Sequence, residues 1–176
     1  MALLAQFKIM NNKGFTLIEL LVSVAIIAVL SGIILYSVTQ YISKGKDSNI
    51  SGNLAILIPA GEVYYNVENA ANQDGYAGFC DPNLNSVLRD AVAQMPQNTN
   101  GSCYAAGNLA GVCCVVATTY HDAWAACARE FTNGAYAYCV DSRGIKKEIC
   151  EASCAGIVSN SISACPDDVL SSCSSQ

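Results

Sequence analysis

Residues 15–38 read FTLIELLVSVAIIAVLSGIILYSV, a run of 24 mostly apolar residues in which Glu19 is the only charged side chain. A helix needs about 20 such residues to cross the hydrocarbon core of a bilayer, so the run is long enough to span a membrane. The sequence therefore predicts a membrane-spanning helix with one carboxylate near its beginning.

Glu19 needs a partner, because placing a carboxylate in hydrocarbon costs roughly 2.5–3.5 kcal/mol. Cleavage of the chain before Phe15 would create a cationic α-amine at the start of the helix. A helix cannot easily fold that amine onto its own fifth residue, so we expect the partner to belong to a neighbouring chain. The chemistry of Glu19 thus predicts assembly of several copies through this helix.

The residues around this position resemble a known family. Lys13-Gly14 followed by Phe15-Thr16-Leu17-Ile18-Glu19 resembles the processing site of type IV prepilins and pseudopilins. The resemblance implies that a prepilin peptidase cuts between Gly14 and Phe15 on the cytoplasmic face and methylates the new amino-terminal Phe15. It also implies that Glu19 is the assembly glutamate of the mature chain.

The same resemblance divides the chain into three parts: a leader over 1–14 that is removed, a transmembrane and assembly helix over 15–38, and a remainder over 39–176. Met10 offers an alternative start that would leave a short, polar leader. An ordinary secretory signal peptide does not fit, because its apolar region is only about 7–15 residues long and is cut on its far side. A plain membrane anchor is the other reading, but an anchor gives Glu19 no role.

Charge and length limit the remaining functions. Removal of 14 residues from 176 leaves 162, enough for the span and one soluble domain. The loss of Lys8 and Lys13 changes the formal charge from −5 to −7. An acidic chain lacks the basic surface that binding to phosphates requires, so nucleic acid is not a favoured partner.

Ten cysteines follow the apolar run, and their even number indicates a disulfide framework in an oxidising exterior. Each bridge stabilises a small domain by roughly 2–4 kcal/mol, although the sequence leaves the pairing open. Cys113 and Cys114 are neighbours in a predicted strand, so they should point to opposite faces and take different partners. A zinc site from Cys150, Cys154, Cys165 and Cys173 is a weaker alternative, because their spacing matches no strong zinc pattern. The disulfide candidates are Cys80, Cys103, Cys113, Cys114, Cys127, Cys139, Cys150, Cys154, Cys165 and Cys173.

Beyond the span, apolar residues recur every three or four positions and predict that the helix continues as an amphipathic one. Its inner stripe is predicted to contain Ile50, Leu54, Leu57, Gly61 and Tyr64, with Ile58 and Tyr65 at the edge and Asn49, Asn53 and Glu62 facing out. Pro59 should kink this helix or end it early, and the resemblance favours a kink. Residues 69–78 are predicted to form a turn-rich loop.

The rest of the head is predicted to hold a short helix and a small sheet. Asp81-Pro82 is a good helix start, and Pro96 should end that helix, whose apolar face would be formed by Leu84, Val87, Leu88, Ala91, Val92 and Met95. A loop is expected at 97–102. Three strands are predicted at 112–120, 123–131 and 135–141, joined by tight turns into an antiparallel meander. Residues 144–176 have little apolar content and should depend on disulfides for their order.

The sequence offers no convincing catalytic group. His121 is the single histidine, and its neighbour Asp122 is poorly placed to orient it, so we interpret His121 as a surface turn residue. A ligand-stacking patch of Trp124, Tyr120, Tyr136 and Tyr138 is less favoured than packing of these rings in the core. We therefore expect no enzyme activity, no cofactor and no metal.

These features predict an α+β protein: a long N-terminal helix, half membrane and half amphipathic, packed on a small antiparallel sheet that disulfides staple. The predicted function is a structural subunit of a type IV pilus-like filament. The precursor would cross the inner membrane once, and the assembled filament would lie at the cell surface. Expected partners are other copies, related pilins, prepilin peptidase and the pilus assembly platform. The alternatives are a pseudopilin of a type II secretion or DNA-uptake machine and a monomeric, membrane-anchored binding module.

Overall fold

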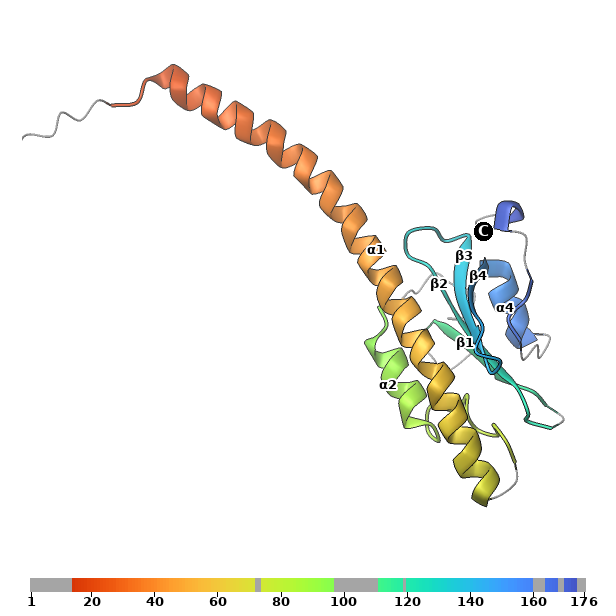
Figure 1. Cartoon of the computed structure of the whole chain (residues 1–176). Coiled ribbons are helices and arrows are strands. Elements are labelled where there is room, and N and C mark those ends of the chain that lie inside the picture. Colours follow the sequence, from red (N-terminus) through yellow and green to blue (C-terminus); the bar gives the residue numbers. More distant parts are fainter. Residues whose placement is uncertain are drawn as a thin grey trace, which may run out of the picture. The chain divides into compact units, whose positions relative to one another are not determined.

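The computed structural model describes residues 14–71, 74–96, 111–118, 120–159, 164–167 and 170–173. Its longest element is helix α1 (Leu17–Ala71), shown in Figure 1. By internal packing the chain divides into two units, of which the first ends at Thr39 and the second begins at Gln40. The predicted loop at 97–102 and Cys103 lie outside the described residues.

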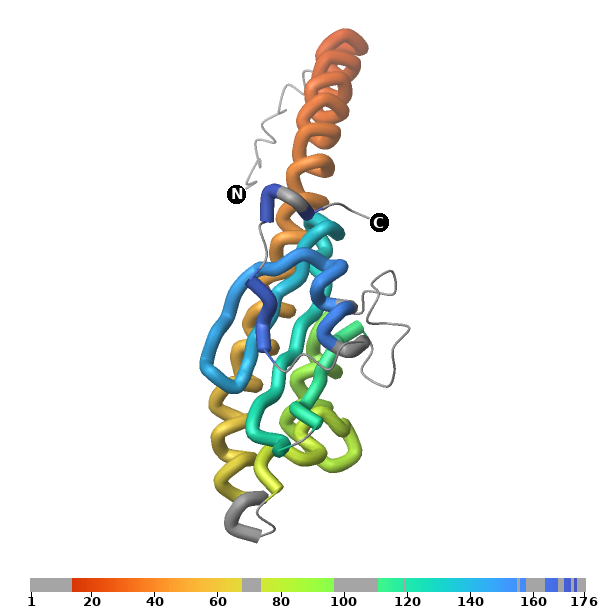
Figure 2. The backbone as a smooth tube through the Cα atoms, turned by 90° about the vertical axis from the view of Figure 1, so that its right-hand side faces the viewer, coloured from red at the N-terminus to blue at the C-terminus, as the bar shows by residue number. Residues whose placement is uncertain are grey.

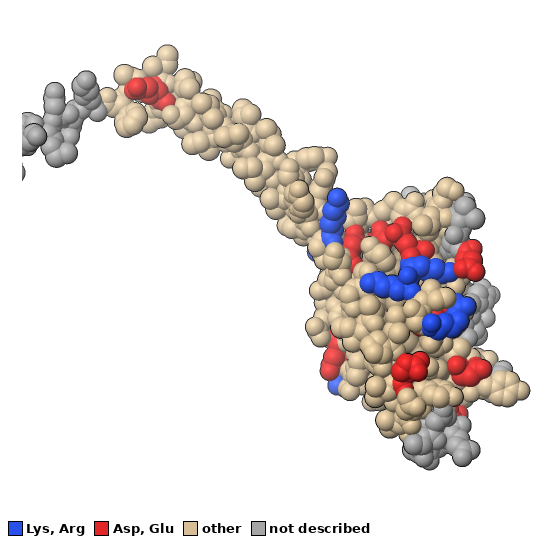
Figure 3. Space-filling view, viewed as in Figure 1, with Lys and Arg blue, Asp and Glu red and all other residues tan. Residues whose placement is uncertain are grey.

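The first unit contains the apolar half of α1. Every large apolar side chain from Phe15 to Val38 is exposed, with exposed fractions between 44% at Val38 and 88% at Phe15. Among the described residues, α1 is long and apolar enough to cross a membrane within Leu17–Val67. In Figure 3 its surface carries one acidic spot and no basic side chain over this half. An apolar helix that its own chain leaves uncovered needs a lipid or protein environment.

The second unit is a sheet covered on both faces. Strands β1 (Val112–Val116), β2 (Trp124–Arg129), β3 (Tyr136–Asp141) and β4 (Lys146–Cys150) form an antiparallel meander in the order β1-β2-β3-β4. Helix α2 (Ser86–Gln94) and the second half of α1 lie on one side of the sheet, and α4 (Glu151–Ser159) lies on the other (Figure 1). A short helix, η1 (Leu170–Ser172), follows near the C-terminus. The long helix and disulfide-stapled antiparallel sheet confirm the predicted α+β class.

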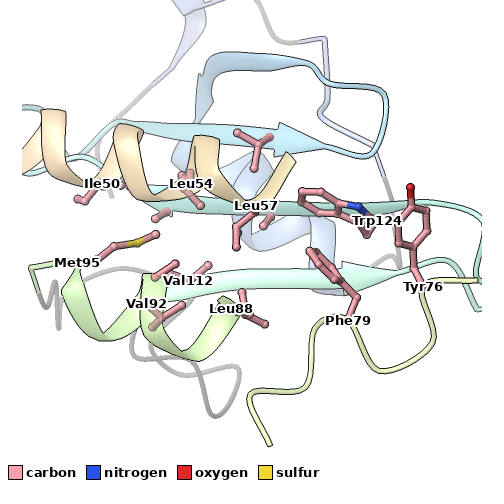
Figure 4. Close-up of a cluster of buried hydrophobic side chains, with 14 residues drawn as sticks. Ile50, Leu54, Leu57, Tyr76, Phe79, Leu88, Val92, Met95, Val112 and Trp124 are labelled. Atoms are coloured by element: carbon pink, nitrogen blue, oxygen red, sulfur yellow. The ribbon is translucent and has the colours of Figure 1, made fainter. Parts of the chain in front are cut away.

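The core on the α1 side is built from the predicted inner stripe. Ile50, Leu54 and Leu57 are at most 2% exposed and point toward the sheet, where Trp124 is fully buried (Figure 4). Helix α2 adds Leu88 and Val92 from the same side of the sheet. Three turns of helix and a strand thus share one apolar layer, which fixes α1 on the head. The fully buried Leu54 is the kind of residue whose truncation typically costs about 2–5 kcal/mol.

Gly61 is where α1 comes closest to the sheet. A Cβ placed on Gly61 would lie 2.6 Å from Nε1 of Trp124, well inside van der Waals contact. The indole also packs against Phe79, with ring centroids 4.6 Å apart, and against Tyr76 at 6.5 Å. The glycine is therefore required by close approach, and the aromatic cluster behind it prevents the indole from moving away.

Three details of α1 differ from expectation or refine it. Asn53 was predicted to face solvent but is only 9% exposed, because its amide donates back to the carbonyl and side-chain oxygens of Asn49 and is satisfied locally. Pro59 does not end the helix, which continues to Ala71. Pro59 itself is exposed, and the helix continues past it without the backbone hydrogen bond that proline cannot donate.

The short helix begins later than the sequence suggested. The side chain of Asn85 accepts from the backbone N–H of Leu88 at 3.1 Å and caps α2, whereas Asp81 accepts from the amide of Asn83 in a turn before it. Asp81 and Asn85 are both residue types that favour helix caps, and Asn85 forms the cap of α2. Leu84 therefore falls outside the helix and is 67% exposed instead of packing in the core. Val87 is likewise 42% exposed, while the other four predicted face residues are buried.

The predicted sheet was correct in topology and incomplete in extent. The first strand is shorter than predicted, since β1 ends at Val116, and β4 and α4 were not foreseen. Strand β4 is an edge strand with the sequence KKEIC. Its charged residues give no apolar pattern that would predict a strand, although charged side chains are common on edge strands. Figure 2 shows the C-terminal segments of the chain lying against the sheet on the side away from α1.

We predict opposite effects for alanine at two glycines of α1. Gly61→Ala should lower the free energy of unfolding by about 1–3 kcal/mol, because the new methyl group overlaps the Trp124 ring. Gly52→Ala is the matched control, since a Cβ added there would have no neighbouring atom within 4 Å. It should stabilise by about 0.5–1 kcal/mol through helix propensity alone. Thermal unfolding of the disulfide-intact chain in neutral detergent measures both, and equal effects would contradict the proposed close approach.

Candidate functional site

The predicted processing and assembly residues lie at the beginning of α1. Gly14, Phe15 and Thr16 precede the first helical turn, and all three are exposed. The bond between Gly14 and Phe15 therefore lies in non-helical chain next to the apolar helix. Phe15, at 88%, has the largest exposed fraction of the exposed large hydrophobic side chains.

Glu19 already has a partner in its own chain. One carboxylate oxygen, Oε2, accepts from the backbone N–H of Thr16 at 2.9 Å and from its hydroxyl at 2.8 Å. In return the amide of Glu19 donates to the Thr16 hydroxyl at 3.3 Å. This reciprocal arrangement is a capping box, which satisfies the first backbone donors of a helix with its own side chains.

The capping box leaves Glu19 able to bind more. A carboxylate offers about four acceptor positions, and Oε2 uses two with Thr16. Glu19 is exposed, so an amine of another copy can approach it. The sequence pattern pointed to an intermolecular partner and left Thr16 unnoticed, although Thr-x-x-Glu over 16–19 is itself a capping-box signature.

The cysteines form a covalent framework in the second unit. Four disulfides are described: Cys80–Cys114, Cys127–Cys154, Cys139–Cys165 and Cys150–Cys173. Cys113 is also disulfide-bonded, and no described cysteine is free. Adjacent Cys113 and Cys114 serve opposite faces of the sheet as predicted, since Cys114 packs on the α1 side and Cys113 is buried among residues on the α4 side.

Three cysteines lie side by side across the sheet. Cys113 of β1 pairs in register with Cys127 of β2, which pairs in register with Cys139 of β3. The sulfurs of Cys113, Cys127 and Cys154 lie within 4.8 Å of one another, a spacing that would suit a metal ion. Metal binding needs thiolates, and these sulfurs are held in disulfides. The four cysteines considered for zinc are likewise divided among three different bridges.

Asp141 holds the C-terminal segment against the sheet. Its carboxylate is fully buried and accepts from the amide of Cys165 at 3.0 Å and from Nε of Arg143 at 3.0 Å. Burial alone would raise the pKa of Asp141, but these bonds, with those from the amides of Arg143 and Ile145, outweigh it and lower the pKa below its ordinary value. The anion therefore stabilises the link between the β3–β4 turn and the segment that carries Cys165.

The weaker catalytic and ligand candidates do not form a site among the described residues. His121 pairs with Asp74, 2.9 Å away, and not with its neighbour Asp122. Its backbone adopts a positive φ of 50°, and its carbonyl accepts from the amide of Tyr76, so it fastens a turn to the loop after α1. The proposed aromatic patch is divided, because Trp124 is buried whereas Tyr120 is 79% exposed.

Known proteins resemble this chain in the segment that contains Gly14, Phe15 and Glu19. The family model described as the prokaryotic N-terminal methylation motif matches residues 9–35. The type IV major alpha-pilin of Moraxella bovis is 51% identical over 44 residues, which are 25% of this chain and 28% of that protein. The beginning of the chain is therefore similar to that of type IV pilins.

Other relatives agree and show how far the likeness reaches. Fimbrial protein Q of Moraxella bovis is 49% identical over 44 residues and is again covered over 28% of its length. The type IV wide pilus major component PilA4 of Thermus thermophilus is 28% identical over 109 residues, 61% of this chain and 82% of that protein. The pilin-like chain thus matches barely more than a quarter of the two Moraxella proteins. No solved structure gives a significant match.

We predict that Thr16→Val loosens the first turn of α1 in the pilin-like chain. The substitution keeps the shape of the side chain but removes the hydroxyl, and loss of such a cap costs about 0.5–2 kcal/mol of local stability. Ser23→Ala is the control, because its hydroxyl donates to the Glu19 carbonyl and caps nothing. Amide hydrogen exchange over the first two turns in detergent micelles should rise in the first variant only. Equal exchange in both would exclude the capping role.

Proposed function

We propose that this protein is a structural subunit of a type IV pilus-like filament. The observation that carries the proposal is the apolar half of α1, which is exposed on all sides and carries a single carboxylate within the methylation motif. Lipid would cover this helix in the precursor, and neighbouring copies would cover it in the filament. The relatives named as major pilus components support a pilus over a secretion pseudopilus.

Processing would begin with a prepilin peptidase that cuts between Gly14 and Phe15 and methylates Phe15. The leader over 1–14 would be lost on the cytoplasmic side, and the head would lie outside. Once Phe15 is the first residue, its amine becomes a cation next to an apolar surface. In the assembled filament that amine would meet Glu19 of an adjacent copy, while the assembly platform moves subunits from the membrane into the growing fibre.

Glu19 would have two successive partners in this scheme. In the single chain its carboxylate is held by Thr16, which satisfies the helix terminus while the subunit waits in the membrane. In the filament the amine of another copy would bind the same carboxylate and neutralise it. Removing one partner of an ion pair that is shielded from water leaves the other charge buried and unpaired, which is strongly unfavourable. Assembly should therefore depend strongly on Glu19.

We predict a defined amino terminus for the protein purified from filaments. Its intact mass should correspond to a chain that begins with methylated Phe15, and amino-terminal sequencing should find no residue of 1–14. All ten cysteines are expected in five bridges, so reduction should add about ten hydrogen masses. A chain that keeps its leader and occurs only in the membrane fraction would instead favour the anchored binding module.

We predict that Glu19→Ala abolishes filaments without unfolding the head. Loss of one member of a buried ion pair costs about 3–5 kcal/mol, which is more than about a hundredfold in subunit affinity. Ser23→Ala, one turn further along α1, should assemble normally because Ser23 bonds only its own helix in the single chain. Sheared filaments are quantified by electron microscopy and immunoblot, with membrane levels of each variant as reference. Wild-type amounts of filament from the Glu19 variant would overturn the proposed pairing.

A further inference from the structure

A buried acidic pair lies where α1 enters the head. Asp47 of α1 is only 6% exposed, and its carboxylate accepts from the backbone amides of Phe131 at 2.6 Å and Thr132 at 3.1 Å. These two amides belong to the turn between β2 and β3, residues 130–135. The ammonium group of Lys46 lies 4.6 Å from the centre of the Phe131 ring. Asp47 therefore clamps this turn to the helix.

Glu130 opens the same turn and is buried beside that clamp. Its side chain is 7% exposed, and the groups that face it are Asp47 from α1, Tyr138 from β3 and Glu148 from β4. Two buried carboxylates and a third, exposed one thus meet at one junction, with the tyrosine hydroxyl bonded to Glu130. Burying several like charges together is unfavourable, so one of the buried pair should keep its proton.

The two carboxyl groups differ in their surroundings. Asp47 accepts from two backbone donors of the turn. Burial, followed by the nearby charges of Glu148 and Asp47, raises the pKa of Glu130 from 4.5 to about 7, and the bond from Tyr138 offsets only part of this. Glu130 therefore holds its proton in mildly acidic surroundings.

We propose that Glu130 is a proton-operated latch: when it is neutral, the turn over 130–135 stays clamped to α1 through Asp47, and when it ionises, the turn loosens from the helix. The latch lies where the head packs on α1 through Asp47. Ionisation of Glu130 would therefore release the end of the sheet next to Asp47, while the apolar layer further along α1 stays packed. The inference concerns the head alone and does not depend on filament formation.

The direction of the pH effect follows from the raised pKa. The unfolded chain releases the Glu130 proton near pH 4.5, whereas the folded chain keeps it until about pH 7. Between these values the folded state binds more protons than the unfolded state, so its stability falls as pH rises. Above about pH 7 the carboxylate is charged in both states, and this contribution no longer changes with pH.

The test compares the full-length, disulfide-intact chain with Glu130→Gln in neutral detergent between about pH 5.5 and 8.5, a range that brackets the titration of the folded group. Glutamine keeps the shape of a neutral glutamic acid and cannot ionise. The wild-type unfolding midpoint should fall across this range, whereas the variant should show a much flatter profile and the higher midpoint at the alkaline end. The same pH profile in both proteins would overturn the latch.

A second measurement examines the turn itself. The backbone amide resonances of Phe131 and Thr132 should shift with a midpoint near pH 7 in the wild-type protein and stay constant in Glu130→Gln. A purely structural role for Glu130 would leave these resonances independent of pH in both proteins. Constant resonances in the wild-type protein would therefore contradict the proposal even if global stability varied with pH.

Two surface variants separate this electrostatic mechanism from a packing effect and do not depend on the folding of Glu130→Gln. Glu148→Gln removes an exposed charge that faces Glu130, so it should move the midpoint of the Phe131 shift to lower pH. Asp90→Asn, on the exposed face of α2, is the matched control and should leave that midpoint unchanged. An unchanged midpoint in Glu148→Gln, or a shift of the same size in Asp90→Asn, would count against the latch.

Discussion

The uncovered apolar surface of α1 is the constraint on which the rest of the molecule depends. From Phe15 to Val38 the large side chains are exposed, so this half of the helix has no partner in its own chain among the described residues. From Ile50 onward the same helix buries one stripe on the sheet and leaves the other side free. The two halves of α1 thus lie in different environments. The head must pack on the second half tightly enough to remain folded, whichever environment surrounds the first half.

The two faces of the sheet meet this demand by different means. The face toward α1 is closed by large side chains, with Leu54, Leu57 and Trp124 packed in one layer around Gly61 (Figure 4). The face toward α4 is built largely from small residues and cystines, and the row Cys113, Cys127 and Cys139 runs across three strands. A short C-terminal helix offers little apolar area, so covalent links to Cys154 and Cys165 replace the packing that larger side chains provide.

Periodicity predicted the parts of this fold that rest on a repeated apolar signal. The stripe through Ile50, Leu54 and Leu57 was foreseen because its burial is visible as spacing, and the first three strands were foreseen as runs bounded by tight turns. Strand β4 and helix α4 were missed, since one is an edge strand rich in lysine and the other consists largely of small residues and is bridged to Cys127. Side-chain to backbone bonds decided the remaining differences: Asn85 outcompetes Asp81 as the helix cap, and Asn53 is buried because it bonds its own helix.

The candidate assembly residues could be predicted for a different reason, namely that a charge in an apolar run has few physical explanations. Glu19 stands out in sequence, whereas the role of Thr16 becomes evident only when the turn is built and its hydroxyl faces the carboxylate. Buried charges elsewhere follow the same logic with opposite outcomes. Asp141 is surrounded by donors, so its lowered pKa makes it a source of stability that is present above about pH 4 and is lost on strong acidification. Glu130 is surrounded by acids, and its raised pKa makes its contribution to stability fall as pH rises toward about 7. Together these two carboxylates favour a head that is most stable in a mildly acidic medium, a property set by which neighbours each acid meets and not by the overall negative charge of the chain.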